Sequence, residues 1–434
     1  MGGSHHWQSW SGLSQARPAR VLRPADAGEV ADAVVAARRN GLRVKMVGSG
    51  HSFTDIAVTD GLLLRPDRLT GIRAVDRAAM TVTVEAGTTL RDLNARLEAL
   101  GLALHNLGDI DAQTVAGAIS TGTHGAGGRW ASLSAQVVAV ELVLADGTLL
   151  VASEHEDPDL FEAARLGLGA VGVLTAVTFA VEPAFLLQAT EWPIAWSEIV
   201  DVLDDLAAEH HHVDLHWFPH TERALAKVND RTLDGAAPLS RARAWFEDDL
   251  MANGAFGAIN RVGNSSPRLV PALNRLAARG LSTREYVDVS HRVLVSERRV
   301  RFKEMEYAVP REAALAALAE ARRVMERGGW PVSFPVEIRP TPADDLWLST
   351  SSGHASVYLA FHVNAATDHT GYFGAVERVL LDHGGRPHWG KVHTCSAEAL
   401  ATAYPSWGRF QAVRDRVDPE RVFGNPYLEK VLGP

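Results

Sequence analysis

The sequence is short of the features that mark secreted and membrane proteins. It contains one cysteine, Cys395, in 434 residues, so an internal disulfide is excluded and we expect a reducing, cytoplasmic environment. It has no run of 18 apolar residues, which argues against a membrane-spanning helix. Residues 1–15 hold no apolar signal-peptide core, so we expect no secretory signal.

An excess of basic residues is also missing. The 43 lysines and arginines are outnumbered by 52 acidic residues, which gives a formal net charge of -9. Because phosphate binding requires a basic face, this charge argues against a nucleic-acid partner. The hydrophobic share of 46% is typical of a globular protein, and the length suggests two or three domains.

The first 180 residues contain a pattern of alternating helices and strands. Apolar residues recur at helical spacing from Val30 to Ala37, and Asp26 stands where a helix cap is needed. The same reasoning predicts further helices over residues 90–100 and 158–165, and strands over residues 42–47, 81–85, 137–144 and 173–181.

The pattern changes after Pro183, where the segments become longer and carry more aromatic residues. A helix is predicted over residues 311–327, and strands over residues 332–339 and 356–364 are expected to be antiparallel. We therefore expect three parts: a first domain over residues 1–182, a second domain over residues 183–388, and a tail over residues 389–434 that returns to the first domain.

The segment from Gly167 to Gly172 matches the dinucleotide-binding pattern G-x-G-x-x-G, and Glu191 follows at the distance of a ribose contact. A Rossmann fingerprint needs a strand before the glycines and a helix after them. Here a predicted helix precedes them and a predicted strand follows. We therefore expect these glycines to let the backbone approach a flat ligand or another strand.

A loop rich in glycine and serine, residues 47–53, follows the strand predicted over residues 42–47. The backbone N–H groups and hydroxyls of such a loop suit a pyrophosphate. The alternative is an ordinary turn between a strand and a helix. The candidate binding residues are Gly48, Ser49, Gly50, His51 and Ser52.

A second loop, residues 115–127, is dominated by small and hydroxylated residues. Without bulky side chains, its backbone can lie against a planar ring or against phosphates. A flexible surface loop is the alternative, although Val115 and Ile119 argue against pure flexibility. The candidate binding residues are Gly117, Thr121, Gly122, His124 and Gly125.

Four segments occur in an order that resembles one protein family. They are residues 48–53 (GSGHSF), 121–125 (TGTHG), 169–173 (GAVGV) and 386–391 (RPHWGK). Together they resemble the vanillyl-alcohol-oxidase-type, or PCMH-type, FAD flavoproteins. The resemblance is to the sugar branch, which holds the aldonolactone (gulono-, galactono- and arabinono-1,4-lactone) oxidases or dehydrogenases and the alditol oxidases, and it extends from Arg23 to Asn425.

The resemblance implies an α+β fold. In this family FAD lies between two α+β subdomains of the FAD-binding domain, a cap domain with a large antiparallel sheet covers the isoalloxazine ring, and the tail rejoins the FAD-binding domain. The resemblance also adds four residues to the candidates for cofactor binding, namely Gly108, Gly172, Val173 and Asn425.

The resemblance gives His51 a particular role, because in many members the histidine of this loop carries the flavin covalently through its 8α-methyl group. A neutral imidazole is a suitable nucleophile for such a bond. Alternatively, His51 only hydrogen-bonds the cofactor. A second link through cysteine is excluded, since Cys395 lies far downstream of the family position.

Glu337 and Arg339 lie two residues apart on a predicted strand, so their side chains share one face. They form either an exposed ion pair or a clamp for sugar hydroxyls, and the alditol oxidases have the same Glu-x-Arg pattern. The resemblance also places Lys391 and His362 beside the substrate. Arg339 and Lys391 would stabilise the alcohol oxygen as its proton leaves, and His362 would orient hydroxyls or take the proton.

Two positions depart from the alditol-oxidase pattern, in which alanine and serine are usual where this chain has Gly108 and Asp109. An ionised aspartate only accepts hydrogen bonds, so Asp109, which we count among the catalytic candidates, argues against open-chain polyols. Gly108 lies where family members control the access of oxygen, and its missing side chain favours an oxidase over a dehydrogenase.

Five histidines between residues 210 and 220 suggest a metal site. His212, Asp214 and His216 alternate along a predicted strand and so share one face. Their spacing matches no familiar zinc pattern, and we expect no metal.

The sequence thus predicts an FAD-dependent oxidoreductase that oxidises a CH–OH group of a sugar-derived substrate by hydride transfer to flavin N5. An aldono-1,4-lactone is the favoured substrate, with O2 or another acceptor reoxidising the flavin. Two alternatives stay open. One is an alditol oxidase that acts on a primary hydroxyl and releases H2O2, and the other is a flavin-binding module without turnover.

Overall fold

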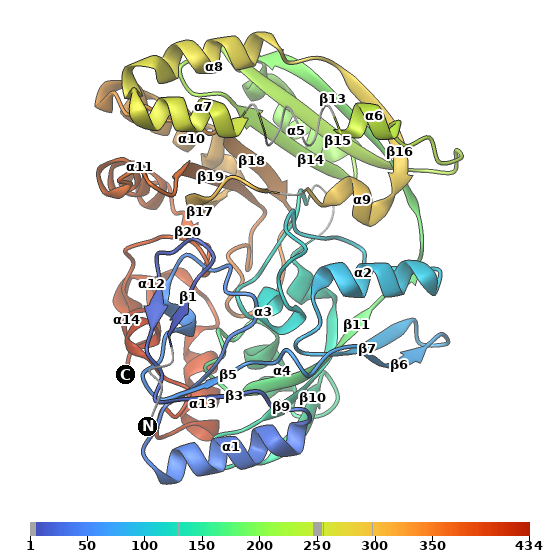
Figure 1. Ribbon diagram of the computed structural model, residues 1–434, viewed down its shortest axis with the longest axis vertical. Helices are drawn as coiled ribbons and strands as arrows, with labels where there is room; N and C mark the ends of the chain where they lie inside the picture. The colour runs from blue at the N-terminus through green and yellow to red at the C-terminus, as the bar shows by residue number, and fades with distance from the viewer. Residues whose placement is uncertain (1–5, 128–130, 246–253, 255, 297) are drawn as a thin grey trace.

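The computed structural model describes residues 6–127, 131–245, 254, 256–296 and 298–434. Figure 1 shows two parts, one below that holds both ends of the drawn chain and one above that contains a long sheet. The first five residues of the segment in which no secretory signal is expected lie outside the described residues. Over the described ranges, no helix has both the length and the hydropathy that a bilayer crossing requires.

The first subdomain is a small parallel sheet covered by one helix. Its strand order is β3 (Arg20–Leu22), β5 (Leu62–Leu64) and β4 (Val44–Met46). Helix α1 (Ala27–Arg39) begins at Asp26, whose side chain accepts a hydrogen bond from the Glu29 N–H as predicted. The apolar face of α1 packs on this sheet through Val30, Val34 and Ala37.

The second subdomain is a five-stranded antiparallel sheet with three helices. The strands predicted over residues 81–85, 137–144 and 173–181 are confirmed as its members, and the helices predicted over residues 90–100 and 158–165 are confirmed beside it. In order, the strands are β10 (Leu149–Ser153), β9 (Val137–Val143), β11 (Val173–Ala180), β7 (Thr81–Glu85) and β6 (Ile72–Asp76), and the helices are α2 (Leu90–Ala99), α3 (Val115–Ser120) and α4 (Pro158–Arg165).

The expectation of a loop over residues 115–127 is wrong for its first half, which is helix α3. The Thr114 side chain caps this helix by accepting a hydrogen bond from the Gly117 N–H. Val115 and Ile119 are fully buried, so packing outweighs the low helix propensity of a short segment that contains glycine. The G-x-G-x-x-G segment lies between α4 and β11, the reverse of the Rossmann order, as predicted.

The upper part is built on an eight-stranded sheet in which every strand pairing is antiparallel (Figure 1). The strand predicted over residues 356–364 is confirmed, and the one predicted over residues 332–339 begins later than expected. In order, the strands are β16 (Arg284–Val289), β13 (Leu186–Ala195), β15 (Arg223–Thr232), β14 (His212–Trp217), β18 (Val336–Thr341), β19 (Ser356–Asn364), β17 (Phe302–Pro310) and β20 (Arg386–Pro387).

The two faces of this sheet differ in chemistry. Helices α10 (Arg311–Gly328) and α11 (Thr370–Asp382) pack against one face, where alternate strand residues such as Ile338 and Phe361 are apolar and buried. The strand residues that alternate with these apolar ones include most of the charged side chains. They point to the opposite face of the sheet, because successive strand side chains point to opposite faces. The charged face is the one that meets the lower part of the molecule.

The change from one part to the other falls close to residue 183. Strand β12 (Glu182–Pro183) still pairs with β8 (Leu102–Ala103) of the lower part, whereas β13 of the large sheet begins three residues later at Leu186. With these bounds we propose the division into residues 1–182, 183–388 and 389–434 that the sequence suggests.

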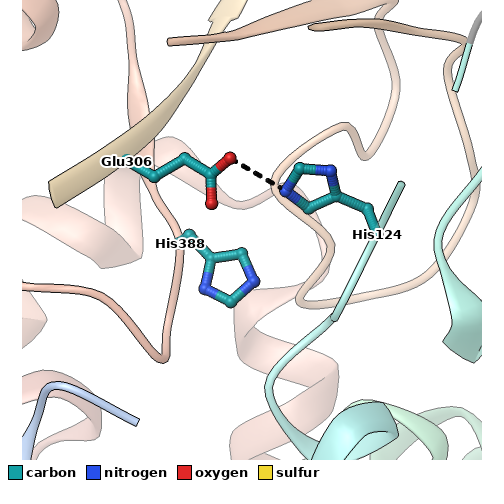
Figure 2. Close-up of side chains that lie close together, drawn as sticks. All are labelled: His124, Glu306 and His388. Atoms are coloured by element: carbon teal, nitrogen blue, oxygen red, sulfur yellow. Dashed lines mark ion pairs between the residues drawn. The ribbon is translucent and has the colours of Figure 1, made fainter. Parts of the chain in front are cut away.

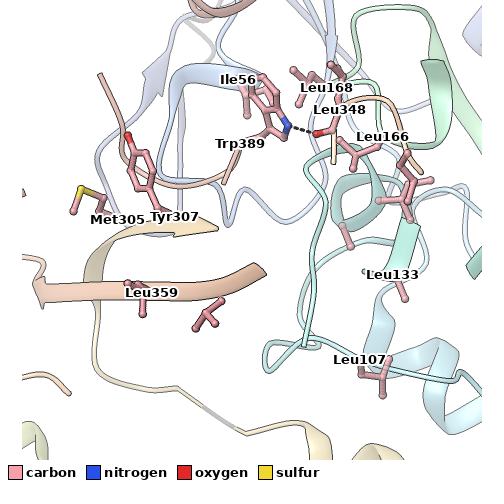
Figure 3. Close-up of a cluster of buried hydrophobic side chains, with 14 of the residues drawn as sticks. Ile56, Leu107, Leu133, Leu166, Leu168, Met305, Tyr307, Leu348, Leu359 and Trp389 are labelled. Atoms are coloured by element: carbon pink, nitrogen blue, oxygen red, sulfur yellow. Dashed lines mark hydrogen bonds between the residues drawn. The ribbon is translucent and has the colours of Figure 1, made fainter. Parts of the chain in front are cut away.

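The tail forms helices α12 (Ala397–Ala403), α13 (Trp407–Val417) and α14 (Pro426–Leu432), of which α13 packs on α4. Asn425 begins α14, and its side-chain amide donates to the carbonyls of Asp55, Ile56 and Val58 at 2.9, 3.1 and 2.9 Å. Further up, Trp389 donates from Nε1 to the Leu348 carbonyl at 2.7 Å within an apolar core that reaches from Ile56 to Leu359 (Figure 3).

Candidate active site and cofactor groove

The three glycine-rich segments, residues 47–53, 115–127 and 167–172, contribute to the lining of one cavity that is partly open to solvent. Because these segments are far apart in the sequence, only the fold brings them together. Nine of the predicted cofactor-binding residues are in the lining, namely Gly48, Ser49, Gly50, His51, Ser52, Gly117, Thr121, Gly172 and Val173. Five lie outside it, namely Gly108, Gly122, His124, Gly125 and Asn425.

The glycines of the lining keep the backbone close to its neighbours. A Cβ on Gly48 would overlap the Thr114 hydroxyl that caps α3, and a Cβ on Gly172 would lie 2.7 Å from Leu142 Cδ1. Neither position has room for a side chain. At these two positions the cavity wall is bare backbone, which lets a nucleotide with a flat ring and phosphates approach closely.

His51 lies where this cavity approaches the charged face of the sheet. Its ring stacks on Trp10, with ring centroids 5.3 Å apart and planes inclined by 26°. Burial, with a contribution from the nearby Lys391 ammonium, lowers the pKa of His51 to about 4. The imidazole is therefore neutral near pH 7 and retains a nucleophilic nitrogen.

Lys45 is a lining residue that sequence reasoning missed. Its side chain is buried, and its ammonium donates to the Phe423 carbonyl at 3.1 Å and lies 3.5 Å from the Gly169 carbonyl. It makes no ion pair with a carboxylate in the described part of the chain, and burial lowers its pKa to about 7. A buried lysine in this groove that forms no ion pair with a described carboxylate fits the diphosphate of FAD.

Glu337 and Arg339 form a buried ion pair, so the alternative of an exposed pair is wrong. Their side chains are 5% and 9% exposed, and Arg339 Nη2 lies 2.5 Å from Glu337 Oε2. The Arg339 Nε also donates to Asp214 at 3.1 Å. Burial opposes ionisation of Glu337, but Arg339 and nearby cationic groups outweigh it and hold its pKa below the ordinary value.

Asp109 does not stand free in the site. It accepts hydrogen bonds from the Ser296 hydroxyl and from Arg298, whose Nε and Nη2 lie 3.0 and 2.6 Å from Asp109 Oδ2. Arg298 Nη2 also lies 3.3 Å from Glu337 Oε1. Asp109, Arg298 and the Glu337–Arg339 pair thus form one charged cluster between the two parts of the molecule.

Lys391 and His362 meet at a carboxylate that the sequence did not single out. The Lys391 ammonium donates to Glu304, and His362 Nε2 lies 3.4 Å from Glu304 Oε1. The other ring nitrogen of His362, Nδ1, is buried and has no hydrogen-bond partner among the described residues. Although burial opposes ionisation, Lys391 and His362 lower the pKa of Glu304 to about 2.

Three buried side chains from distant segments meet beside this cluster: His124, Glu306 and His388 (Figure 2). His124 Nε2 lies 3.2 Å from Glu306 Oε1, and the His124 ring stacks on Tyr358 with centroids 3.4 Å apart. Their ligand atoms lie within 4.8 Å of one another, a spacing that would suit a cation.

The hydrogen bonding of His388 argues against a metal at this point. Burial lowers the pKa of His388 to about 3, so the ring is neutral, and its Nδ1 accepts the Gly390 N–H at 3.0 Å. The single ring proton is then on Nε2, which has no lone pair left for a cation. We therefore treat the three residues as a polar contact between the loop of His124 and the large sheet.

The histidines between residues 210 and 220 are dispersed. His210 and His211 both contact Asp230, at 2.5 and 3.1 Å, whereas His216 lies 3.8 Å from Glu337. His212 and His216 share a strand with Asp214, as predicted, but Asp214 is engaged by Arg339.

Some of the missed residues carry a signal in the sequence and others do not. Glu304 and Glu306 alternate on β17 in the same way as Glu337 and Arg339 on β18, so strand periodicity was sufficient to place both on one face. Arg298 lies outside any helix or strand, and its position depends on Asp109, which is 189 residues away. No local pattern could have indicated that contact.

Comparison with known proteins gives consistent matches over the whole chain. A D-arabinono-1,4-lactone oxidase family model matches residues 177–431, and an FAD binding domain model matches residues 18–153. The chain is 39% identical to L-gulono-1,4-lactone dehydrogenase of Mycobacterium tuberculosis, with 99% of each chain covered. It is 35% identical to L-gulonolactone oxidase of Mus musculus and 33% identical to an alditol oxidase of Streptomyces sp., with 98% of each chain covered in both cases.

The fold is also that of a solved oxidase. Cholesterol oxidase from Brevibacterium sterolicum superposes with a TM-score of 0.82 over 98% of this chain and 96% of that chain. At 19% sequence identity this likeness shows the fold alone. It agrees with the α+β architecture and the large antiparallel sheet described above.

Proposed function

The chain belongs to the FAD-binding family of aldonolactone oxidases and dehydrogenases, and from that premise we propose which of its residues carry out the FAD-dependent oxidation of a sugar lactone. One observation carries the proposal. The charged face of the large sheet ends close to His51, which lines the cavity. FAD, when bound, supplies the hydride acceptor. The protein has to bind the lactone, place its CH–OH group and remove the hydroxyl proton.

We assign the proton to His362. Glu304 faces Nε2 of this ring, and a carboxylate there favours the tautomer with hydrogen on Nε2. Nδ1 is then a free acceptor, and it is the nitrogen that lacks a partner among the described residues. Because Nδ1 is buried, a substrate hydroxyl that donates to it and loses its proton there has to displace the side chains packed around the ring.

Arg339, Lys391 and Glu337 hold the substrate in this proposal. Glu337 accepts from sugar hydroxyls, while the two cations stabilise the oxygen from which the proton departs. Because Lys391 and Arg339 are each already paired with a carboxylate, their charge is partly neutralised. Their contribution is therefore more one of orientation than the sequence alone suggested.

We propose that His51 carries the flavin covalently, supported by its neutral imidazole and its place in the cavity lining. The expected result is that acid-precipitated wild-type protein stays yellow, whereas acid releases all flavin from His51→Ala. The measurement is flavin absorbance in pellet and supernatant. Complete release from the wild type would contradict the covalent bond but leave the reaction untouched.

For the electron acceptor we propose O2. The support is the missing side chain of Gly108 at the position where family members control oxygen access, although Thr123 Cγ2 fills the space that a Cβ would take, 2.7 Å away. The relative from Mycobacterium tuberculosis is named a dehydrogenase, so an artificial acceptor is the competing possibility. Oxygen consumption with a lactone, compared with reduction of a dye in the absence of oxygen, separates the two.

The reaction itself is tested by anaerobic mixing with sugar substrates. Gulono-, galactono- or arabinono-1,4-lactone should bleach the visible flavin band, and xylitol or sorbitol should do so slowly or not at all. Bleaching by the alditols together with an unchanged band in the lactones would replace this proposal with polyol oxidation. His362→Asn, with a similar shape but no basic nitrogen, should bind lactone and bleach slowly.

A further inference from the structure

We propose that Arg298 is the residue that recognises the carbonyl oxygen of the lactone, and that Asp109 serves to hold Arg298 in place. This inference rests on the proposed function, since it names the feature by which the same site selects a lactone over a polyol. It changes the role of Asp109 from a substrate contact to a positioning residue.

The first step is that Asp109 is already occupied. Both of its oxygens accept hydrogen bonds, Oδ1 from the Ser296 hydroxyl and Oδ2 from Arg298. The Asp109 carbonyl also accepts the Ser296 N–H at 3.0 Å. These contacts hold Ser296 and Arg298 against the lower part of the molecule, and they leave Asp109 little capacity to accept from a substrate.

The second step is that Arg298 has donors to spare. A guanidinium has five N–H groups. Those on Nε and Nη2 are directed to Asp109 and Glu337, while Nη1 makes no hydrogen bond to any described residue. The side chain is 36% exposed, so a small molecule can reach it.

The third step is the position of Arg298 on the charged face. Glu337 lies between two guanidiniums, with Arg298 Nη2 at 3.3 Å and Arg339 Nη2 at 2.5 Å. Arg339 contacts a second carboxylate, Asp214, and Lys391 is paired with Glu304. Of these three cations, Arg298 is the most accessible, because its side chain is 36% exposed, compared with 9% for Arg339 and 18% for Lys391.

The chemistry of that open donor selects the ligand. The carbonyl oxygen of a lactone is a pure acceptor, and an alditol offers no equivalent group, only hydroxyls that both donate and accept. A charged donor with no protein partner is matched by an acceptor that has no hydrogen to give. The Nη1 group of Arg298 therefore fits the lactone carbonyl.

The experiment compares Arg298→Met and Asp109→Asn with the wild type. Loss of a charge-assisted hydrogen bond should lower kcat/KM for a 1,4-lactone on the order of 100-fold, mainly through KM. The slow reaction with xylitol should change less than threefold. Asp109→Asn should shift the lactone KM in the same direction by a smaller factor, because Arg298 is then held less firmly.

Arg38→Met is the matched control. Arg38 donates from Nε and Nη2 to Glu420, at 3.0 and 2.5 Å, as Arg298 does to Asp109. It lies on the far surface of the lower part. This variant should leave both kinetic constants unchanged. Flavin content and melting temperature of all three variants report whether each has folded.

A second measurement needs no turnover. γ-Butyrolactone has the carbonyl but no hydroxyl to oxidise, and tetrahydrofuran has the same ring without the carbonyl. γ-Butyrolactone should perturb the flavin spectrum of the wild type with a dissociation constant that rises at least tenfold in Arg298→Met, while tetrahydrofuran should bind both proteins equally weakly.

The outcomes separate this inference from the proposed function. If Arg298→Met reduces lactone and xylitol oxidation equally, or leaves the lactone KM unchanged, Arg298 does not read the carbonyl. The same holds if γ-butyrolactone binding is unaffected. If no lactone bleaches the wild type, the proposed function fails, and the γ-butyrolactone titration still decides the role of Arg298.

Discussion

Lys45 is the residue whose burial we relate to binding of the FAD diphosphate rather than to stability of the fold. Burial disfavours its charged form, so its pKa in the folded protein, about 7, lies below the ordinary value of 10.5. Between these two values the unfolded chain holds a proton that the folded protein does not. Stability of the flavin-free protein should therefore rise with pH across this window, by up to ~1.4 kcal/mol per pH unit for one proton.

Replacing Lys45 with methionine tests this directly. In the His51→Ala background, from which flavin can be removed, Lys45→Met should raise the melting temperature at pH 7 and abolish the gain between pH 7 and pH 9. It should also weaken ADP binding on the order of tenfold, because the diphosphate loses its counter-charge. Lys430→Met, at an exposed position on α14, is the control. An unchanged melting temperature at pH 7 would contradict the buried charge.

The position of a single residue could be predicted where the sequence follows the two-residue alternation of a strand. Glu337 and Arg339 could be placed on one face because strand side chains alternate. Lys45 lies on the strand predicted over residues 42–47, but alternation along that strand does not show that the lysine is buried. Arg298 and Asp109 belong to no regular element, and their contact arises only when the two parts of the chain meet.

Among the elements, helix α3 depends on a contact with the first glycine loop. Gly48→Ala should displace Thr114 from its capping position and lower stability by about 1 kcal/mol or more, with less flavin bound per protein. Melting temperature and the ratio of flavin to protein absorbance measure both effects.

The control is a glycine without such a neighbour. A Cβ added at Gly374, inside α11, would meet no atom of another segment within 4 Å, so Gly374→Ala should stabilise the protein by roughly 0.5–1 kcal/mol. If both substitutions have the same effect, the contact between Gly48 and Thr114 does not matter for α3.

Most elements were predictable because they carry their own signals, such as the Asp26 cap of α1 and the alternation in β19. Helix α3 was missed because its six residues are small and its stability comes from burial, which a sequence pattern of that length does not reveal. The composition of the glycine-rich loops suggested a site for phosphates or a planar ring, and the resemblance added FAD, since a glycine-rich segment alone has many explanations.

For the whole molecule, the charged face predicts a loss of stability in acid. The pKa of Glu304 is about 2 in the folded protein, below its ordinary value of 4.5, and those of Glu306 and Glu337 are lowered as well. A carboxylate with a depressed pKa contributes stability above its unfolded value, and that contribution is lost as pH falls from 4.5 towards 2.

The melting temperature should therefore fall between pH 5 and pH 3. Glu304→Gln should be less stable than the wild type at pH 7, since it leaves Lys391 without its partner, and its melting temperature should change less over this range. Glu154→Gln, at an exposed position, should follow the wild type. Parallel curves for all three proteins would contradict a role for Glu304.

The division into parts was suggested by the change in pattern near residue 183, but the contacts between the parts were not. The Glu182 carboxylate, for example, contacts Arg231 of the upper part at 2.5 Å, across 49 residues. The sequence separation of such pairs follows no pattern, because they form only when the folded parts pack against each other.

The route of the tail has a consequence for how the protein is made. Phe423 lines the groove, and the Asn425 side chain donates a hydrogen bond to the Asp55 carbonyl. Both residues nevertheless leave the ribosome after all strands of the upper sheet. The groove can therefore be completed only once translation has passed these residues. Loading with FAD is then a late event in biogenesis, and a nascent chain stalled before residue 423 would display a finished cap above an unfinished nucleotide site.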